Sequence, residues 1–526
     1  MRLMRFERHY TREEAERLFD GDFLLPDDFM FGVANSGYQT EGGFNGPGEP
    51  QNNWFDLEAS GKVERSGEAI RFWTEHPADV GLAAGIGLNA FRLGIEWARV
   101  QPDASRRTSG VPPFFEAAIE GYARMIACVM RAGMEPVVTL HHFTHPRWLG
   151  IDFWLENEKI GLFRAYVEEF ARRVNELLVE EHGQRPVHMW ITLNEPNILA
   201  VGAYLVRYMP HGRFGVRTTA RALSNMLAAH CESYDCLRRI YRENGWPAPL
   251  VTYNTAQTCI YEFDKVATDI LTARRNGVER RGVEAYLESG RAAWYEEIAR
   301  CPEVAPSPRA GSALEKLVVR SADLLFRLGD YESALDAIYA SGEPEKMDFI
   351  AVDFYDPFLR HMVKLPGVAD IKGRRFDFHF DHWDQVLNPR AMYHFLKAAL
   401  INGEGLPAVI LESGMATRVR GGRAAPRRDG ATRDRFLRYY IFEAMRALKD
   451  GIPLEGYFYW SLVDNYEWGS YDPRFGLYTV DREAGTARRP VDAWGVDAGG
   501  AYAGLIAALR SGDRELMVEA FAGDGT

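Results

Sequence analysis

The stretch HMWITLNEPN, residues 188–197, places a carboxylate directly after an apolar run of the kind that forms β-strands. Strand interiors avoid bare carboxylates, because burying an unpaired charge costs free energy. Glu195 is therefore expected either in a solvated surface loop or in a site that holds its carboxylate for a chemical purpose. The segments on either side of this stretch distinguish the two cases.

Short apolar runs of the same kind recur along the chain. We predict eight strands, at residues 29–34, 89–96, 135–142, 188–195, 249–255, 348–355, 408–414 and 455–462. Segments with helical periodicity, such as FEAAIEGYARMIACVMRAG, lie between them. Alternation of strands and helices predicts a parallel sheet. Eight such units without a second block of composition predict one α/β domain over residues 1–526, a single (β/α)8 TIM barrel.

Three segments exceed a minimal barrel. Residues 1–25 are expected to form an N-terminal helical extension, in which Thr11 and Glu14 have the spacing of a capping box. Residues 261–346 are expected to form a helical insertion between strands five and six. The Gly-, Pro- and Asn-rich loop 42–53 follows strand one. The loop and the insertion would lie as long βα-loop insertions at the carboxyl face of the barrel.

Composition limits the classes of partner. The 526 residues are 46% hydrophobic and 26% charged, which is typical of globular proteins, and the net charge of −12 disfavours nucleic acids and anionic membranes. The five cysteines form no CxxC pair, so we expect reduced thiols in a cytoplasmic protein and no zinc site. Neither a signal peptide nor an apolar run of about 18 residues is present in the sequence, so no membrane span is predicted.

The predicted strands end on polar side chains. These are Glu96, His141, His142, Asn194, Glu195, Asn254, Asp353, Tyr355 and Glu412, with Asn465 and Glu467 just beyond the eighth strand. In a barrel the carboxyl ends of the strands converge on one face, where active sites lie. Solvation does not explain so many polar strand ends, so Glu195 is predicted to lie in a shared site. Glu96 is expected to have a structural role as the partner of a nearby cation such as Arg92.

Two carboxylates, Glu195 and Glu412, end strands four and seven and would face each other across the barrel. Cleavage of a glycosidic bond needs two facing carboxylates, one as nucleophile and one as acid/base. The nucleophile must stay ionised, whereas the pKa of the acid must be raised by its surroundings. Once the nucleophile is esterified its charge disappears, and the other carboxyl can act as a base.

The ordered motifs FMFGVANSGYQTEGG, NAFRLGIEWARVQP, VVTLHHFTHPRWL, ITLNEPN, VILESGMA and FYWSLVDNYEWGSYDPRFGLYTVD resemble those of glycoside hydrolase family 1, the β-glucosidase family. The resemblance extends from Pro26 to Trp494, and GIEW, HHFT and LENEKIGLF are similar to the archaeal-type β-glycosidase branch. It implies a retaining exo-β-glycosidase with a two-step covalent mechanism and with no cofactor or metal.

The resemblance also implies roles for individual residues. Glu195 corresponds to the acid/base and Glu412 to the nucleophile. Asn194 would bind the sugar 2-hydroxyl, a contact that strengthens in the transition state. Arg92 and Tyr355 would flank Glu412 and keep it ionised.

A further group of side chains corresponds to the family's sugar-binding residues. Gln39, His142 and Glu467 would bind the outer hydroxyls of the sugar. Trp460 would form the floor on which the sugar stacks, and Trp468 would hydrogen-bond to the sugar through its indole. Phe475 would line the far wall.

The chain departs from the family's usual motifs near the predicted site. Residues 412–414 read ESG in place of ENG, and Asp353 stands where strand six usually carries Asn. Phe143 and Thr144 replace the commoner Trp-Asp pair. An extra carboxylate at Asp353 would raise the pKa of neighbouring acids.

The Glu467-Trp468 pair indicates the substrate class. Members of the family that act on 6-phosphoglycosides replace this pair and add a Lys/Tyr phosphate grip. We therefore predict neutral β-glycosides as small-molecule or oligosaccharide substrates, with glucosides first and galactosides or fucosides open. Two alternatives stay open: a transglycosylase that uses the same site, and a catalytically inert sugar-binding barrel. The oligomeric state, a homo-oligomer included, is also open.

Overall fold

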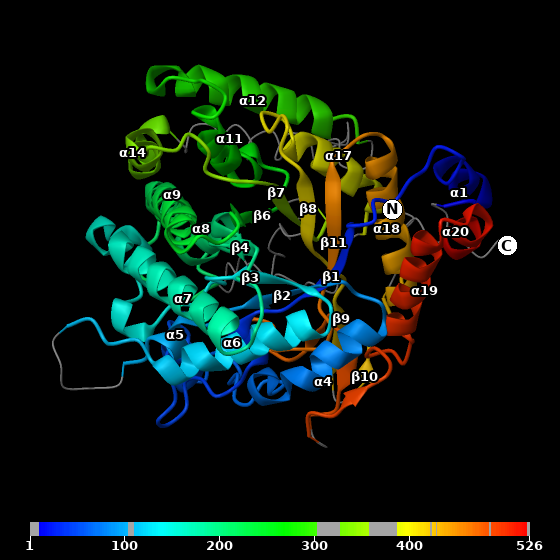
Figure 1. Ribbon diagram of the computed structural model, residues 1–526, viewed down its shortest axis with the longest axis horizontal. Coiled ribbons are helices and arrows are strands. Elements are labelled where there is room, and N and C mark those ends of the chain that lie inside the picture. The colour runs from blue at the N-terminus through cyan, green and yellow to red at the C-terminus, as the bar shows by residue number, and fades with distance from the viewer. Residues whose placement is uncertain are drawn as a thin grey trace, which may run out of the picture.

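The structure, a computed structural model, describes residues 10–103, 110–301, 327–356, 387–420, 423–427, 429–482 and 485–522. Its centre is a nine-stranded parallel sheet in the order β5–β4–β3–β2–β1–β11–β8–β7–β6 (Figure 1). The strands are β1 (Met30–Ala34), β2 (Ala90–Gly94), β3 (Glu135–Thr139), β4 (Met189–Ile191), β5 (Leu250–Thr252), β6 (Asn254–Ala256), β7 (Ile350–Phe354), β8 (Ala408–Ser413) and β11 (Leu454–Trp460).

The sheet closes because one predicted strand is used twice. β5 and the first two residues of β6 fall within the predicted run 249–255, and Tyr253 separates the two strands. β5 pairs with β4, and β6 pairs with β7. Eight strand positions therefore surround the axis, which confirms the predicted (β/α)8 barrel, and every predicted strand is found.

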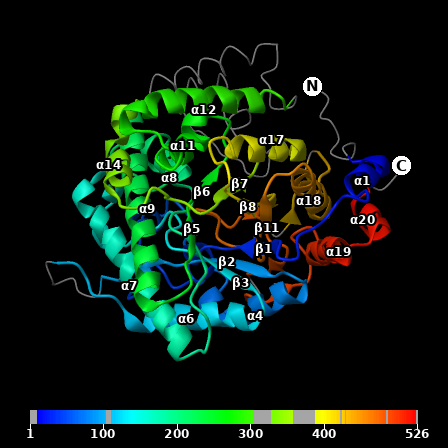
Figure 2. The same cartoon turned by 45° about the horizontal axis from the view of Figure 1, so that its top comes forward.

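Helices surround this barrel on the outside (Figures 1 and 2). They are α1 (Arg12–Leu18), α2 (Gly37–Thr40), α3 (Phe55–Ala59), α4 (Phe72–Gly85), α5 (Trp97–Val100), α6 (Glu116–Arg131), α7 (Ile160–Glu180), α8 (Pro196–Tyr204), α9 (Val216–Asn244), α10 (Tyr261–Asp264), α11 (Val266–Ala273), α12 (Val283–Ile298), α14 (Glu332–Ala340), α17 (Pro389–Ala399), α18 (Arg433–Lys449), α19 (Ala498–Ser511) and α20 (Arg514–Phe521). In α6, Ile119, Tyr122, Ile126 and Val129 are buried at the spacing of one helix face, so that face packs inward.

The first and last described helices meet on one side of the barrel. α1 begins with Thr11, whose side chain accepts from the Glu14 amide in a capping box. α1 packs against α20 and α18, and the rings of Phe19 and Phe521 lie 5.1 Å apart (Figure 2). Apolar contact with the last helix therefore holds the N-terminal segment in place.

The segment between β6 and β7 is helical in its described part. α10, α11 and α12 lead to residues 302–326, which lie outside the described residues, and α14 follows. α14 packs on α9, and α12 packs on α17. This segment therefore adds helices outside the ring rather than strands to the barrel.

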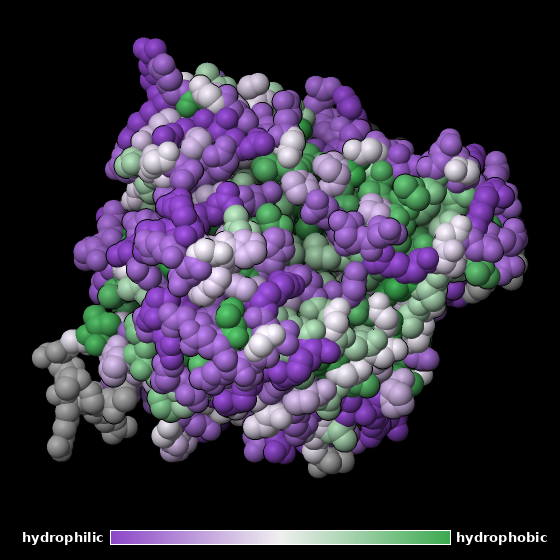
Figure 3. Space-filling view, viewed as in Figure 1, coloured by the Kyte–Doolittle hydropathy of each residue, from purple (hydrophilic) through white to green (hydrophobic). Residues whose placement is uncertain are grey.

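The barrel is filled by its own apolar cluster. Nine buried side chains from the strands and their flanks form it: Ala90, Val137, Met189, Ile191, Phe349, Ala351, Val409, Leu411 and Phe458. A much larger cluster lies between the barrel and the helices. On the face shown in Figure 3, hydrophilic side chains predominate over the outer helices, and hydrophobic ones gather in smaller patches. Among the described helices, none is long and apolar enough to cross a membrane.

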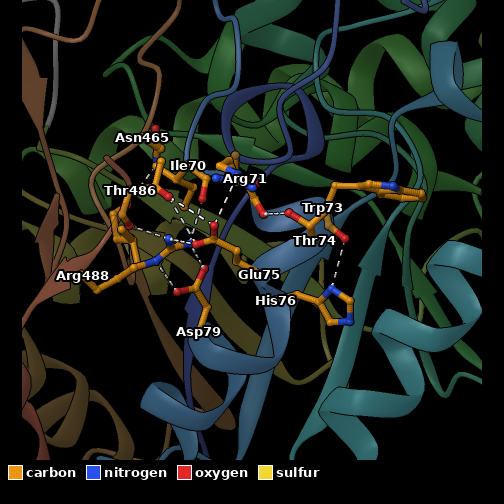
Figure 4. A network of polar contacts seen from close by, with 12 residues as sticks. Ile70, Arg71, Trp73, Thr74, Glu75, His76, Asp79, Asn465, Thr486 and Arg488 are labelled. Carbon is orange, nitrogen blue, oxygen red and sulfur yellow. Dashed lines mark hydrogen bonds and ion pairs between the residues drawn. The ribbon is translucent and has the colours of Figure 1, made fainter. Parts of the chain in front are cut away.

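Short strands complete the region that follows the barrel. They are β9 (Thr417–Arg420), β10 (Arg423–Ala424), β12 (Pro473–Arg474), β13 (Thr479–Val480) and β14 (Arg488–Arg489). In β14, Arg488 donates to both carboxylate oxygens of Asp79 at 2.7 Å and to Glu75 at 2.7 Å, and both partners belong to α4 (Figure 4). Arg488 also donates to the Ile70 carbonyl at 2.8 Å. These contacts bind the segment around β14 to α4 and to the loop that precedes it.

The Arg488 network predicts a stability difference between two neighbouring arginines. The side chain of Arg488 is 8% exposed and that of Asp79 is 1% exposed, so Arg488→Ala leaves a buried carboxylate without its cation. We expect a loss of about 3–5 kcal/mol in the free energy of unfolding, measured by urea denaturation. Arg489→Ala is the matched control, because Arg489 is 57% exposed and pairs with Asp481 at the surface. It should cost no more than about 1 kcal/mol, and equal losses would contradict this account.

Candidate active site

Arg92 lies at the centre of the side chains that gather at the carboxyl ends of the barrel strands. It belongs to β2 and is fully buried. Its guanidinium donates to Glu412 Oε1 at 2.5 Å and to Asn194 Oδ1 at 2.5 Å. Its Nε donates to Thr139 Oγ1 at 2.9 Å. One arginine therefore binds groups from β3, β8 and the loop after β4.

Glu412 reaches this position through an irregularity in β8. The register pairs Val352 with Ile410 and then Asp353 with Glu412, so Leu411 is an extra residue on β8. Such a β-bulge re-aims the side chains that follow it. Glu412 consequently lies beside Arg92 and accepts a hydrogen bond from the Tyr355 hydroxyl at 2.6 Å.

The glycine of the ESG motif is required by close backbone packing. A Cβ atom on Gly414 would lie 2.3 Å from the carbonyl oxygen of Trp460. Only glycine fits at this distance without movement of the backbone. The motif thus keeps β8 and β11 in contact directly beyond Glu412.

Glu195 enters the same group from the start of α8. It is the N-cap residue, its φ is +39°, and Pro196 occupies the first turn. A left-handed conformation is strained for a residue with a side chain, and such strain is concentrated at functional sites. Carboxylate oxygens of Glu195, Glu412 and Asp353 all lie within 4.8 Å of one another. The chain therefore brings both predicted catalytic carboxylates together and adds a third.

The surroundings of these carboxylates differ. Burial, and then the charge of Glu412, raise the pKa of Glu195 to about 8. Burial also raises the pKa of Glu412, but the charge of Arg92 and hydrogen bonds from Tyr355 and Arg92 oppose that rise. Glu195 is thus the better proton holder of the two, and Glu412 is the carboxylate that has a cation in direct contact.

The predicted sugar-binding residues lie in two groups around the three carboxyl groups. Gln39 and Glu467 form one group, and His142 and Trp468 form the other, with Trp460 next to both. Gln39 donates to Glu467 at 3.2 Å, and the Trp460 side chain acts to lower the pKa of the same carboxyl group. The ring of His142 lies parallel to the rings of Trp460 and Trp468, with centroids 5.8 Å away in each case. Burial, and then the charge of Glu412, raise the pKa of Glu467 to about 8.

The two groups connect to the central residues. Asn194 Nδ2 lies 3.3 Å from Nε2 of His142. Phe475 packs edge-on against Tyr355 at 6.1 Å. The structure therefore brings all eleven predicted site residues into one region: Gln39, Arg92, His142, Asn194, Glu195, Tyr355, Glu412, Trp460, Glu467, Trp468 and Phe475.

Asn254 is a member of the site for which the sequence predicted no role. It is the first residue of β6, and its amide nitrogen donates to Asn194 Oδ1 at 2.8 Å and to Asp353 Oδ2. Its own Oδ1 accepts from Arg92 at 3.3 Å. The signal available in the sequence was its position among the polar strand ends.

The prediction for Glu96 is wrong in its partner. Glu96 accepts hydrogen bonds from the Thr144 hydroxyl at 2.6 Å and from the Ala98 amide at 3.4 Å, and it does not pair with Arg92. Arg92 is directed to Glu412 instead. Burial raises the pKa of Glu96 to about 8, so Thr144, one of the departures from the family motif, supplies a hydrogen bond to a buried acid.

A metal ion is not favoured by this arrangement. Within the described residues, one group has the spacing of metal ligands, namely the carboxylates of Glu195, Asp353 and Glu412. The guanidinium of Arg92 contacts Glu412 directly and already supplies a positive charge there. A second cation would have to be bound against that charge.

The comparisons with known proteins agree with the geometry. The sequence profile described as Glycosyl hydrolase family 1 matches residues 22–291 and 344–493. The unmatched interval falls inside the segment 261–346 that was expected to be an insertion.

Curated relatives and solved structures carry related names. The chain is 26% identical over 484 residues to 6-phospho-beta-galactosidase of Lacticaseibacillus rhamnosus, covering 87% of this chain and 94% of that protein. It is 25% identical over 471 residues to Beta-glucosidase A of Thermotoga maritima, covering 87% and 93%. The structure of beta-glycosidase from Pyrococcus horikoshii covers 95% of this chain and 98% of its own, with 24% identity and a TM-score of 0.63, and supports the fold.

Glu96 gives a prediction for stability as a function of pH. Its pKa in the folded protein is about 8, above the ordinary value of 4.5, so between these values the folded state holds a proton that the unfolded state has lost. Its contribution is therefore fully present below 4.5 and is lost as the pH rises through about 8. Glu96→Gln should weaken the fall in the free energy of unfolding across that interval, measured by urea denaturation at several pH values.

The control for this measurement is a glutamate at the surface. Glu120→Gln, at a side chain 47% exposed on α6, should leave the pH dependence as in the wild type. An unchanged pH dependence in Glu96→Gln would contradict the assignment of a buried, protonated Glu96.

Proposed function

The chain belongs to glycosyl hydrolase family 1 and is a β-glycosidase, and we propose that it is a retaining, exo-acting enzyme for neutral β-glycosides, with β-glucosides preferred. Glu412 is the proposed nucleophile and Glu195 the proposed acid/base. The observation that carries this proposal is the close approach of two carboxyl groups with opposite surroundings, one bound to a cation and one buried with a raised pKa.

The spacing supports retention of configuration. Inverting glycosidases keep their carboxyl groups about 6.5–9.5 Å apart to admit a water, and retaining ones place them about 5–5.5 Å apart. One carboxylate oxygen of Glu195 and one of Glu412 lie within 4.8 Å of each other. This close approach supports the retaining arrangement, in which one carboxylate attacks the sugar directly.

In the first step, an oxygen of Glu412 attacks the anomeric carbon while Glu195 gives its proton to the glycosidic oxygen. The carbon–oxygen bond breaks, and its electron pair leaves with the aglycone as an alcohol. Arg92 and the Tyr355 hydroxyl hold Glu412 in its ionised form and fix the orientation of its two oxygens. The product is a glycosyl ester on Glu412.

In the second step, Glu195 acts as the base. The esterified Glu412 no longer carries a charge, so the pKa of Glu195 falls and its carboxylate can take a proton from water. The hydroxide equivalent attacks the anomeric carbon and releases Glu412. Asn194, which accepts hydrogen bonds from Arg92 and Asn254, is the proposed ligand of the sugar 2-hydroxyl in both steps.

The surroundings of Glu467 support neutral sugars. Its side chain accepts a hydrogen bond from the uncharged amide of Gln39, and the other group that favours its ionised form is the uncharged side chain of Trp460. A carboxyl group among neutral donors suits a pair of sugar hydroxyls, whereas a phosphate needs cationic donors. Several relatives are named 6-phospho-beta-galactosidases, so 6-phosphoglycosides are the competing substrate class.

The two other candidates have less support. An inert sugar-binding barrel would be expected to lack one of the two carboxyl groups. Here Glu195 and Glu412 are both present and lie close together. Transfer of the sugar to an alcohol would use the same two steps with the alcohol in place of water. Product ratios at increasing alcohol concentration separate transfer from hydrolysis.

The acid role of Glu195 predicts a dependence on the leaving group. Glu195→Ala should lower kcat/KM for methyl β-glucoside by about 10²–10⁴-fold, because an alkoxide leaves poorly without a proton. With 2,4-dinitrophenyl β-glucoside, whose phenolate leaves without protonation, kcat/KM should change far less. Hydrolysis of both substrates by Glu195→Ala and the wild type is measured at one pH.

The matched control changes a glutamate on the outer surface. Glu243→Ala, at a side chain 57% exposed on α9, should leave both values of kcat/KM unchanged. Equal slowing of the two substrates by Glu195→Ala would contradict the acid role and favour a purely structural one.

A further inference from the structure

Asp353 is a third carboxyl group in the site, where the family usually carries an amide. It lies on β7, is fully buried, and is paired in register with Glu412 on β8. Its Oδ2 accepts a hydrogen bond from Asn254. Its Oδ1 is buried and has no hydrogen-bond donor among the described groups. Buried carboxylate oxygens without donors are rare, so this atom calls for an explanation.

The neighbouring carboxyl group of Glu195 offers an explanation. One carboxylate oxygen of Asp353 and one of Glu195 lie within 4.8 Å of each other, and each of the two groups shifts the pKa of the other. Two ionised carboxylates are both acceptors and cannot bond, but a carboxylic acid donates well to a carboxylate. A proton held between Glu195 and Asp353 would therefore turn two mutually repelling acceptors into a hydrogen-bonded pair.

The charges around Glu195 and Asp353 also favour a proton on this pair. Arg92 is the cation in contact with this group, and it is engaged with Glu412. The groups that act on Asp353 are Glu412, Glu195 and Arg92, and burial together with the two glutamates raises its pKa well above the usual value. Glu467 adds a further acid on the side of Glu195, and Tyr355 is a neutral donor to Glu412. Three ionised carboxylates beside one arginine would be strongly destabilised.

We propose that Asp353 shares a proton with Glu195, so that the acid/base of this enzyme is a carboxylic acid–carboxylate pair rather than a single glutamate. The inference rests on the proposed function of Glu195. Asp353 is a positioning residue in this scheme, because it acts on the substrate through Glu195. Two carboxyl groups that share a proton titrate as a pair with widely separated pKa values, so the pair keeps its last proton to a higher pH than one carboxyl would.

The shared proton is the one used in the reaction. It passes from the pair to the glycosidic oxygen as that oxygen leaves with the electron pair of its bond to carbon. In the same step Glu412 becomes an ester, and the charge of Arg92 is then available to the ionised pair. When water attacks the ester, its proton returns to the pair. No oxidant, reductant or further reactant is needed.

The test is the pH profile of Asp353→Asn, which keeps the shape of the side chain and a donor toward Glu195. For methyl β-glucoside, the alkaline limb of kcat/KM should move to lower pH by about one unit or more, because Glu195 then titrates alone. For 2,4-dinitrophenyl β-glucoside, which needs no proton in the first step, kcat/KM should show no such shift. Far-ultraviolet circular dichroism confirms that the variant is folded.

The matched control is the same change three positions along the chain. The carboxylate of Asp356 is buried and accepts from the Asn388 amide at 2.7 Å and from Tyr440, outside the carboxylate group. Asp356→Asn should leave the alkaline limb in place. An unmoved limb in Asp353→Asn, or an equal shift for the two substrates, would overturn the proposal while leaving the glycosidase function intact.

A second measurement does not depend on activity. Infrared spectra recorded as the pH is raised should lose a carbonyl band of protonated carboxylic acid at lower pH in Asp353→Asn than in the wild type. Loss of the same bands at the same pH in both proteins would overturn the shared proton. Loss of activity in EDTA, restored by a divalent cation in the wild type but not in Asp353→Asn, would assign the three carboxylates to a metal instead and would also overturn it.

Discussion

The ion pair between Arg92 and Glu412, buried at the carboxyl end of the barrel, is the interaction on which the rest of the site depends. An arginine without exposed surface must be fully paired, because an uncompensated buried charge is strongly destabilising. Arg92 meets this need with Glu412, Asn194, Asn254 and Thr139. The same bonds join β2 to residues of β3, β6 and β8 and of the loop after β4. The contacts that compensate the charge of Arg92 therefore also align the proposed reacting groups.

This ion pair also makes the protonation of the carboxyl groups differ. It stabilises the negative charge of Glu412, whereas Glu195 and Asp353 have no cation of their own in direct contact among the described residues. A single positive charge therefore determines which carboxyl group stays ionised and which groups hold protons. The backbone contributes through the bulge in β8 and the left-handed conformation of Glu195, which direct both side chains to the same place.

Much of the fold was predictable because its signals are local. Each barrel strand is a short apolar run that ends in a polar residue, and the runs at 188–195 and 408–414 carry their carboxylates within the motif itself. The contacts of Glu96 were not predictable, since Thr144 approaches it from another strand end. The pairing of Asp353 with Glu195 likewise depends on closure of the barrel through the split fifth strand, which no sequence pattern marks.

The most direct test of the central claim is covalent trapping with an activated 2-deoxy-2-fluoro-β-glucoside. The fluorine slows both steps, and the good leaving group lets the glycosyl-enzyme accumulate. The account predicts that intact-protein mass rises by one fluorosugar and that peptide mapping places it on Glu412. A label on Glu195, or steady turnover of the activated glucoside with no covalent adduct, would contradict the account.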